Sequence, residues 1–325
     1  MRILVAGGAG YIGSHTCKAL ARAGHTPIVY DNLSAGHEWA VKWGILERGD
    51  LNDSKLLADV FKRHRPEAVI NFAGLIAVGE STKEPILYYR NNVAGMLTLL
   101  EVMREHDVSS IVFSSTCAIY GVPLQLPIVE SSPQHPINPY GRSKLMGEHI
   151  LRDACAAHGL GAVALRYFNA AGADAEGELG PDHDPVTHLI PLVLQAAAGL
   201  RREIAIFGAD YETPDGTCVR DYVHVTDLAA AHVAALAVSK PGQFKSYNLG
   251  TGRGISVSEV VDAARRITGK PIAVNAAPRR EGDAPLMVAD ASLAEAELKW
   301  HASHSDIENI IGTSWRWMTK HSPSR

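Results

Sequence analysis

Short apolar runs alternate with stretches of helical periodicity through the first half of the chain. The strand-like runs are residues 3–6, 27–30, 45–50, 68–73, 110–115 and 162–167. Apolar residues recur at helical spacing in residues 14–23, 55–64, 91–105 and 139–158. Strands that alternate with helices in this way form parallel β-α-β units with right-handed crossovers. The pattern therefore predicts an α/β fold with a doubly wound parallel sheet.

Beyond Asn169 this regular alternation stops. Residues 170–185 are rich in Gly, Asp and Ala and show little periodicity, which indicates a crossing into a second unit. Later stretches are predicted as helices at residues 189–199 and 256–267 and as strands at residues 203–207 and 247–249. We expect a first domain at residues 1–169, with later segments such as 217–250 returning to it, and a smaller α/β lobe at residues 170–325.

A glycine-rich turn joins the first predicted strand to the first predicted helix. Residues 8–13 read GAGYIG, which matches G-x-G-x-x-G, and Gly7 precedes them. At such a junction the glycines allow a tight turn, a close approach to a pyrophosphate and close packing of helix on strand, and the helix N-terminus attracts negative charge. A match of this kind alone is weak, because ordinary glycine-rich turns share it.

Asp31 strengthens the interpretation of this turn as a dinucleotide site. It ends the second predicted strand, where a carboxylate accepts hydrogen bonds from a ribose 2′-hydroxyl. Because a carboxylate there would repel a 2′-phosphate, the sequence predicts a Rossmann-type domain that binds NAD and not NADP.

Composition narrows the possible partners. The 325 residues suffice for two domains, with 46% hydrophobic and 20% charged residues. The net charge of −4, from 31 Lys and Arg against 35 Asp and Glu, gives no sign of a nucleic-acid or membrane-surface partner. The four cysteines form no C-x-x-C, and the Asp and His residues at 182–188 match no standard ligand spacing, so we expect no metal and no disulfide framework. With no targeting segment or membrane-length run recognised, we expect a cytoplasmic protein.

Tyr140 and Lys144 stand four residues apart in the predicted helix 139–158, so their side chains leave the same face. A phenol is a poor base at neutral pH, but an ammonium and a positive nicotinamide ring beside it favour the phenolate. A Y-x-x-x-K pair is common by chance. Here it follows a predicted strand ending in Ser114-Ser115-Thr116, at the sheet edge where doubly wound folds bind ligands, and it predicts a general base.

At this point the chain resembles the extended short-chain dehydrogenase/reductase superfamily, and within it the UDP-glucose 4-epimerases. The motifs in the first half are GGAGYIGSH at 7–15, DNL at 31–33, FAG at 72–74, AVGES at 77–81, YYRNN at 88–92, SSTCAIYG at 114–121, YGRSK at 140–144 and RYFN at 166–169. Those in the second half are residues 205–211, residues 216–224, NLG at 248–250 and RREGD at 279–283. The second-half motifs belong to sugar-nucleotide epimerases and not to the superfamily at large.

The resemblance implies a role for each matching residue. Tyr140 is the implied base, Lys144 its electrostatic partner and ribose ligand, and Thr116 the hydrogen-bonding partner of the sugar 4-hydroxyl. Besides these three, the implied cofactor contacts are Gly7, Gly10, Tyr11, Ile12, Gly13, Asp31, Asn32, Leu33, Ser34, Ala35, Gly36, Asp50, Leu51, Phe72, Ala73, Gly74, Asn91, Ser114 and Phe168. The implied substrate contacts, with Thr116 and Tyr140, are Asn169, His188, Leu189, Ala205, Ile206, Phe207, Arg220, Arg280, Asp283 and Met287.

Within that set, Asn169, Arg220 and Arg280 are expected at the diphosphate. The planar, permanently charged fork of arginine suits a diphosphate, although composition alone would make these arginines ordinary surface charges. Residues 205–207 are expected along the uracil and Asp283 at its ribose.

Two positions depart from the family pattern. Family members often carry a lysine after Gly74-Leu75 that reaches the cofactor, whereas this chain has Ile76, so one polar cofactor contact is expected to be missing. Met287 stands where members of narrow specificity have a tyrosine beside the sugar. Methionine is slimmer and more adaptable, which predicts poor but detectable use of N-acetylated sugars.

The activity implied is NAD-dependent interconversion of UDP-glucose and UDP-galactose, by oxidation at C4, rotation of the 4-keto sugar and re-reduction. It belongs to galactose and nucleotide-sugar metabolism. A UDP-N-acetylglucosamine or UDP-pentose 4-epimerase is the nearest alternative. A 4,6-dehydratase needs a carboxylate just after Thr116, where Cys117 and Ala118 stand, and a non-catalytic NAD sensor is expected to lose the Tyr–Lys pair or the arginines.

Two further expectations concern assembly and a second glycine-rich turn. Helices 91–105 and 139–158 have apolar residues on more than one face, and their counterparts in the resembling family pair between subunits, so we expect a homodimer. Residues 250–254 read GTGRG, which could hold a phosphate, but Ser256 and Ser258 after them favour a turn that leads into a capped helix.

Overall fold

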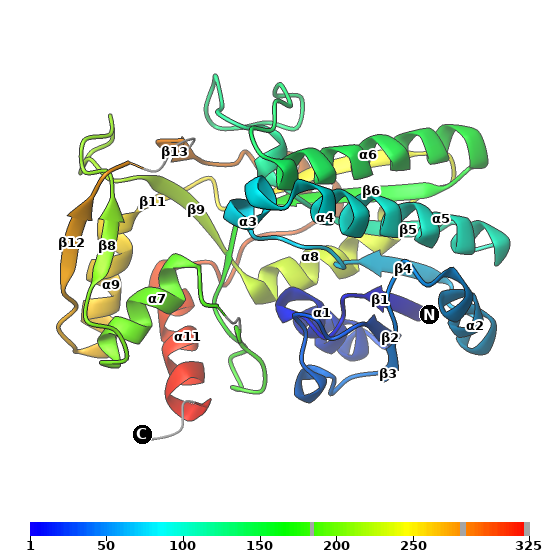
Figure 1. Cartoon of the computed structure of the whole chain (residues 1–325), viewed down its shortest axis with the longest axis horizontal. Helices are drawn as coiled ribbons and strands as arrows, with labels where there is room; N and C mark the ends of the chain where they lie inside the picture. Colours follow the sequence, from blue (N-terminus) through cyan, green and yellow to red (C-terminus); the bar gives the residue numbers. More distant parts are fainter. Residues whose placement is uncertain (183–184, 280–283, 322–325) are drawn as a thin grey trace.

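The computed structural model of the chain describes residues 1–182, 185–279 and 284–321. Its largest unit is a seven-stranded sheet in the order β10-β6-β5-β4-β1-β2-β3, in which every pair of neighbours is parallel (Figure 1). The strands are β1 (Arg2–Ala6), β2 (Thr26–Asp31), β3 (Ile45–Arg48), β4 (Ala68–Asn71), β5 (Ser110–Thr116), β6 (Gly161–Tyr167) and β10 (Phe244–Leu249). The doubly wound parallel sheet predicted from the alternating pattern is confirmed.

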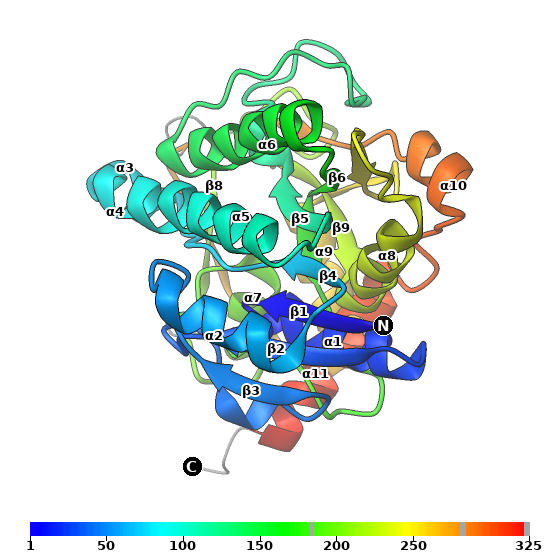
Figure 2. The ribbon, with the colours of Figure 1, turned by 90° about the vertical axis from the view of Figure 1, so that its right-hand side faces the viewer.

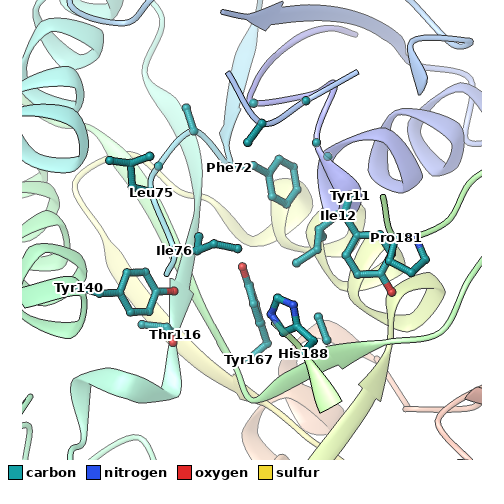
Figure 3. Close-up of a pocket in the computed structure, with 18 of the residues that line it drawn as sticks. Tyr11, Ile12, Phe72, Leu75, Ile76, Thr116, Tyr140, Tyr167, Pro181 and His188 are labelled. Carbon is teal, nitrogen blue, oxygen red and sulfur yellow. The ribbon is translucent and has the colours of Figure 1, made fainter. Parts of the chain in front are cut away.

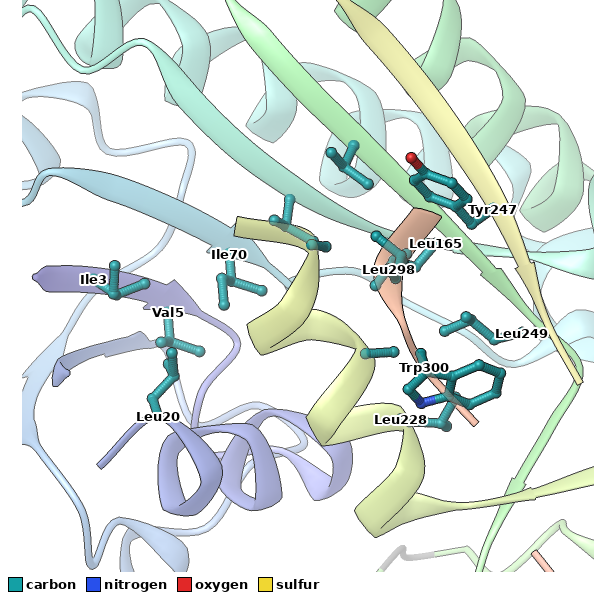
Figure 4. Packing of buried hydrophobic residues seen from close by; sticks show 14 of the residues in the cluster. Ile3, Val5, Leu20, Ile70, Leu165, Leu228, Tyr247, Leu249, Leu298 and Trp300 are labelled. Atoms are coloured by element: carbon teal, nitrogen blue, oxygen red, sulfur yellow. The ribbon is translucent and has the colours of Figure 1, made fainter. Parts of the chain in front are cut away.

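Helices cover both faces of this sheet (Figures 1 and 2). One face carries α2 (Ser54–His64), α5 (Gly95–Glu105) and α6 (Pro139–His158), and the other carries α1 (Tyr11–Arg22), α8 (Val225–Val238) and α10 (Ser292–Leu298). Side chains alternate along each strand, so β1 sends Leu4 to the first face and Ile3 and Val5 to the second. Figure 4 shows the second core, where Leu228 of α8 and Trp300 close over the strands. Burial on both faces explains why the strands are short, continuous apolar runs.

The helix predicted at residues 91–105 begins earlier in the structure. After α3 (Val78–Lys83), the segments α4 (Pro85–Tyr89), a π-helical turn η2 (Arg90–Ala94) and α5 follow one another directly. A π turn widens the helix locally and is frequent at functional sites. Here it carries Asn91 and Asn92. The buried Asn92 accepts a hydrogen bond from the backbone of Leu75 (2.8 Å) and donates one to Ser143 Oγ (2.9 Å).

The second half of the chain forms smaller sheets. Strand β9 (Val219–His224) pairs with β7 (Asn169–Ala171), β11 (Gly254–Ser256) and β13 (Leu286–Met287), and β8 (Ile204–Phe207) pairs with β12 (Val274–Ala277). Helices α7 (Leu189–Ala197), α9 (Val257–Thr268) and α11 (Ile307–His321) enclose a core of their own. Short 3₁₀ turns, η1 (Glu38–Ala40) and η3 (Cys117–Ile119), follow β2 and β5. The described helices include none with the length and apolar character of a membrane span.

Two local features of this half follow the sequence. Ser256 Oγ accepts from the backbone of Glu259 (3.0 Å) while the Glu259 carboxylate accepts from the backbone of Ser256 (2.7 Å), so α9 begins with a capping box. The turn before it is held by the buried Asp221, which accepts from the backbone of Thr251 (2.8 Å). Ser256 caps α9 as predicted, but residues 254–256 first form β11, so the turn at residues 250–253 does not lead directly into the helix. Strand β10 joins the large sheet from this half, whereas the division of the chain into two domains near residue 169 stays a prediction.

Candidate active site

A cavity of about 430 Å³ lies at the carboxyl ends of the large sheet's strands, where doubly wound folds bind ligands. Most of the predicted site residues line it: Gly7, Gly10, Tyr11, Ile12, Gly13, Asp31, Asn32, Ser34, Ala35, Gly36, Asp50, Leu51, Phe72, Ala73, Gly74, Asn91, Thr116, Tyr140, Phe168, Asn169, His188 and Leu189. Figure 3 shows Thr116 and Tyr140 on one side of the cavity and Tyr11 and Ile12 on the other. The turn between β1 and α1 and the end of β5 therefore share one cavity.

The glycine turn allows the protein backbone to come close to a bound ligand. Gly7 has a φ of +76°, and a Cβ there would come within 2.7 Å of the Ala73 backbone nitrogen. A Cβ on Gly13 would overlap the Gly7 carbonyl. Gly10 caps α1 without any side-chain hydrogen bond, so the first amide groups of the helix are not satisfied by a capping side chain. The glycine turn at residues 7–13 and the N-terminus of α1, together called the cradle, therefore suit a pyrophosphate.

Asp31 is fixed at the end of β2 by backbone donors. Its Oδ2 accepts from the Ala9 amide (2.9 Å) and its Oδ1 from the Leu33 amide (2.8 Å). Burial raises the pKa of Asp31 above its usual value, against the lowering effect of these two hydrogen bonds. Leu33 thus supports the carboxylate without lining the cavity. A fixed carboxylate at this place suits a ribose hydroxyl.

Tyr140 and Thr116 present their hydroxyls to the cavity, and both residues are more than nine-tenths buried. Lys144 lies behind them. Its Nζ donates to the Ser114 carbonyl (3.0 Å) and lies 4.9 Å from the centroid of the Phe113 ring, and burial lowers the pKa of Lys144 to about 8. Neither Lys144 nor Ser114 lines the cavity, but a Cβ on Gly74 would lie 3.2 Å from Lys144 Nζ. The ammonium is therefore just beneath the cavity surface.

Burial raises the pKa of Tyr140, while hydrogen bonding with Thr116 acts to lower it. The phenol is accordingly protonated in this apolar setting, and a positive charge in the cavity is needed to favour the phenolate. The lowering of its pKa by Lys144 and a nicotinamide ring stays a prediction about the ligand-bound state.

A buried ion pair anchors the strand that carries Thr116. Ser115 Oγ donates to Glu148 Oε1 (2.6 Å), and Arg166 Nη2 lies 2.6 Å from Glu148 Oε2. Both charged side chains are almost fully buried, and Arg166 also donates to the Tyr120 hydroxyl (2.9 Å). Glu148 is four residues beyond Lys144, so α6 supplies Tyr140, Lys144 and Glu148 from successive turns of one face. That eight-residue spacing was the available signal for Glu148, which the sequence analysis missed.

The residues that are predicted to lie along the uracil do not line this cavity. Ala205, Ile206 and Phe207 lie on β8 and do not line the cavity, and neither does Arg220, whose guanidinium donates to the Val219 carbonyl (2.9 Å). Met287 packs in a buried cluster with Phe168, Ile119 and Tyr120. Arg280 and Asp283 lie outside the described residues, as do His183 and Asp184 of the acidic stretch considered for a metal. The binding roles of this set stay predictions.

The cavity also has lining residues that the sequence analysis did not select. Cys117 and Tyr167 belong to the motifs at 114–121 and 166–169, and the Tyr167 hydroxyl lies 2.9 Å from Ser114 Oγ. Gly172 comes from the segment after β7, Tyr222 from β9 and Ser314 from α11. These three segments are far apart in the sequence, so no local spacing could have linked them to the glycine turn.

The fold and the cavity define a dinucleotide-binding protein with a Tyr–Lys pair at one end of the site. A family model described as "NAD dependent epimerase/dehydratase family" matches residues 3–250, and the chain belongs to this family. The expected resemblance to that superfamily is confirmed.

More particular likenesses cover nearly the whole chain. It is 50% identical to the UDP-glucose 4-epimerase of Rhizobium meliloti (strain 1021) over 319 residues, which is 98% of this chain and 97% of that protein. The crystal structure of UDP-glucose 4-epimerase from Brucella ovis in complex with NAD is 52% identical, with a TM-score of 0.93 and 97% of each chain covered. The structure from Bifidobacterium longum in complex with NAD+ and UDP is 44% identical, with a TM-score of 0.94 and 99% of each chain covered.

Proposed function

We propose that this protein is an NAD-dependent epimerase that interconverts UDP-glucose and UDP-galactose. One observation carries the proposal: Tyr140 and Thr116 meet the glycine turn and Asp31 in a single cavity. The names of the relatives, which are about half identical over nearly the full length, support the same substrate pair.

In this proposal two residues of the chain act on the 4-hydroxyl of the sugar: one transfers its proton and the other holds its oxygen. Tyr140 takes the proton of the sugar 4-hydroxyl and later returns it, and the Thr116 hydroxyl holds the 4-oxygen in place. NAD, when bound, supplies the hydride acceptor and donor at C4 and a positive ring that favours the tyrosinate. The 4-keto sugar turns within the cavity between the two transfers. Proton and hydride both return to the sugar, so no external oxidant is consumed.

Asp31 makes the cofactor NAD and not NADP in this proposal, because its carboxylate repels a 2′-phosphate. The purified protein is denatured and the released nucleotide identified by chromatography. We expect NAD. Recovery of mainly NADP would overturn the assignment of Asp31.

The reaction itself is tested by incubating the purified protein with UDP-galactose and separating the products. We expect UDP-glucose, and none from the Tyr140→Phe variant on the same time scale. A 4-keto-6-deoxy product would instead identify a dehydratase, and unchanged UDP-galactose with NAD bound would identify a non-catalytic binding protein.

We also propose that two copies associate through α5 and α6, and that the protein acts in the cytoplasm. Leu97 on α5 and Met146 on α6 are 45% and 43% exposed, which leaves apolar surface on neighbouring helices. All four cysteines are free thiols, which fits a reducing compartment. Light scattering at micromolar concentration should give a dimer for the parent and a monomer for the Leu97→Lys/Met146→Lys variant. A monomeric parent would contradict the proposed association.

A further inference from the structure

Residues 172–182, here called the strap, lead from the end of β7 along the cavity. Gly172 at one end and Pro181 near the other both line it, and Figure 3 shows Pro181 on the same side of the cavity as Tyr11. The carbonyl of Asp182 lies 2.7 Å from His37 Nε2, in the loop that follows Asp31. The two ends of the strap therefore lie at the cavity, one beside the glycine turn and the other beside the loop that follows Asp31.

Helix α1 fastens the strap from one side. The Tyr11 hydroxyl donates to the Gly172 carbonyl (2.5 Å) at the glycine turn itself. Further along α1, Lys18 Nζ donates to three carboxylates of the strap: Asp174 (2.7 Å), Glu176 (2.6 Å) and Glu178 (2.7 Å). The Lys18 side chain is only 5% exposed and that of Asp174 is 9% exposed.

Helix α11 fastens the same segment from the other side. Thr313 Oγ1 accepts from the Ala173 amide (3.2 Å), Arg316 donates to the Ala175 carbonyl (3.0 Å), and Trp317 Nε1 donates to the Pro181 carbonyl (3.2 Å). These contacts use single neutral hydrogen bonds or an exposed arginine. Contacts of these kinds are individually weak.

The contact at Lys18 is of a different kind, because its buried ammonium meets the buried carboxylate of Asp174 together with the partly exposed carboxylates of Glu176 and Glu178. The three carboxylates each place an oxygen within 4.8 Å of the other two, and the ammonium of Lys18 lies between them. Burial acts to lower the pKa of Lys18, but its hydrogen bonds to the carboxylates raise that pKa overall. Removing this one cation leaves like charges that repel one another at close range. The strap would then be pushed away from α1 and from the cradle.

We propose that Lys18 is a positioning residue that holds the strap closed over the dinucleotide and thereby sets the rate at which the cofactor leaves. The inference rests on the proposed function, since it takes the ligand of the cradle to be NAD. It assigns a role to a residue that lies outside the cavity and touches neither cofactor nor substrate. A cofactor that is regenerated in each cycle benefits from slow release, and the strap supplies it.

The test is the rate of NAD release from holoenzyme into a large excess of labelled NAD. We expect Lys18→Met to release NAD about tenfold faster or more, because breaking a buried charge contact is costly. Turnover at saturating NAD should stay within about twofold of the parent, since no group at the reacting atoms changes. The matched control is Arg22→Met, one turn further along α1. Its contact with Glu176 joins side chains that are 61% and 54% exposed, and we expect less than a twofold change in release.

A second variant separates the proposal from simple destabilisation. In Lys18→Met/Asp174→Asn/Glu176→Gln the repulsion and the buried unpaired carboxylate are removed together with the cation, so release should slow again towards the parent rate. A triple variant as fast as Lys18→Met, or a Lys18→Met holoenzyme that releases NAD like the parent, would overturn the role of Lys18. If the parent holds no NAD at all, the proposed function fails first. If it holds NAD and the variants do not differ, the inference about the strap fails alone.

Discussion

The two halves of the molecule that meet at the cavity differ in how far local sequence identifies their functional groups. In the large sheet, Asp31 ends β2 and Thr116 ends β5, while Tyr140 and Lys144 share one face of α6. In the second half, β9 pairs with segments that begin at residues 169, 254 and 286, and β8 pairs with a strand seventy residues away. The first wall of the cavity is thus encoded in local stretches of sequence, whereas the second depends on tertiary pairing.

The same contrast appears in how the halves handle charge. Behind the site, Glu148 and Arg166 form an ion pair that is 0% and 1% exposed. Arg279 and Asp210 in the second half form a pair that is 47% and 75% exposed. A buried pair demands exact partners because an unpaired buried charge is costly, while an exposed pair is screened and weak. We infer that the Glu148–Arg166 pair tolerates substitution less well than the Arg279–Asp210 pair.

The largest effect expected from this contrast is on stability. Glu148→Gln should lower the free energy of unfolding by about 3–5 kcal/mol, because Arg166 is left buried without its counter-charge. Asp210→Asn, the matched change at the exposed pair, should cost less than about 1 kcal/mol. Urea titration followed by circular dichroism measures both. Equal losses would show that the two halves do not differ in this respect.

The same contrast explains what sequence could predict. The strands β1, β2, β4, β5 and β6, the helix α6, the glycine turn and Asp31 were all recognisable from runs, spacings and short motifs. The strands β7, β9, β11, β12 and β13 and the helices α3, α4, α8, α10 and α11 were not predicted. Of these, α8 is rich in alanine and buried against the sheet, so its residues show no polar face, and β13 is only two residues long. Tyr222 and Ser314 reach the cavity only through such elements.

A second prediction tests whether the reaction depends on Tyr140, on the side of the cavity that the large sheet and its helices form. Tyr140→Phe should reduce turnover by at least about two orders of magnitude, in line with the loss of a positioned general base. Bound NAD should be retained, because the glycine turn and Asp31 are untouched. Turnover on UDP-galactose and the nucleotide released on denaturation are measured on one preparation. Near-normal turnover with NAD bound would rule out Tyr140 as the base.

The smallest effect is expected at Met287, which is predicted to lie beside the sugar. Met287 is 8% exposed and does not line the cavity, but it packs in one cluster with Phe168, which does. A change at Met287 therefore acts through Phe168. Met287→Ala should let Phe168 move back and raise the preference for UDP-N-acetylglucosamine over UDP-glucose by about threefold to tenfold, and Met287→Tyr should lower it.

The matched control for this last prediction is Met103→Ala, which removes a methionine that is 1% exposed in the core of the large sheet. It should lower stability by about 2–5 kcal/mol without altering the preference between the two sugars. The measurement is kcat/KM on both substrates for all three variants and the parent. If only the Met287 variants change the preference between the two sugars, Met287 affects substrate specificity although it does not line the cavity, because it packs against Phe168. If neither Met287 variant does, Met287 is a packing residue only, and the sugar end of the site is formed by other residues.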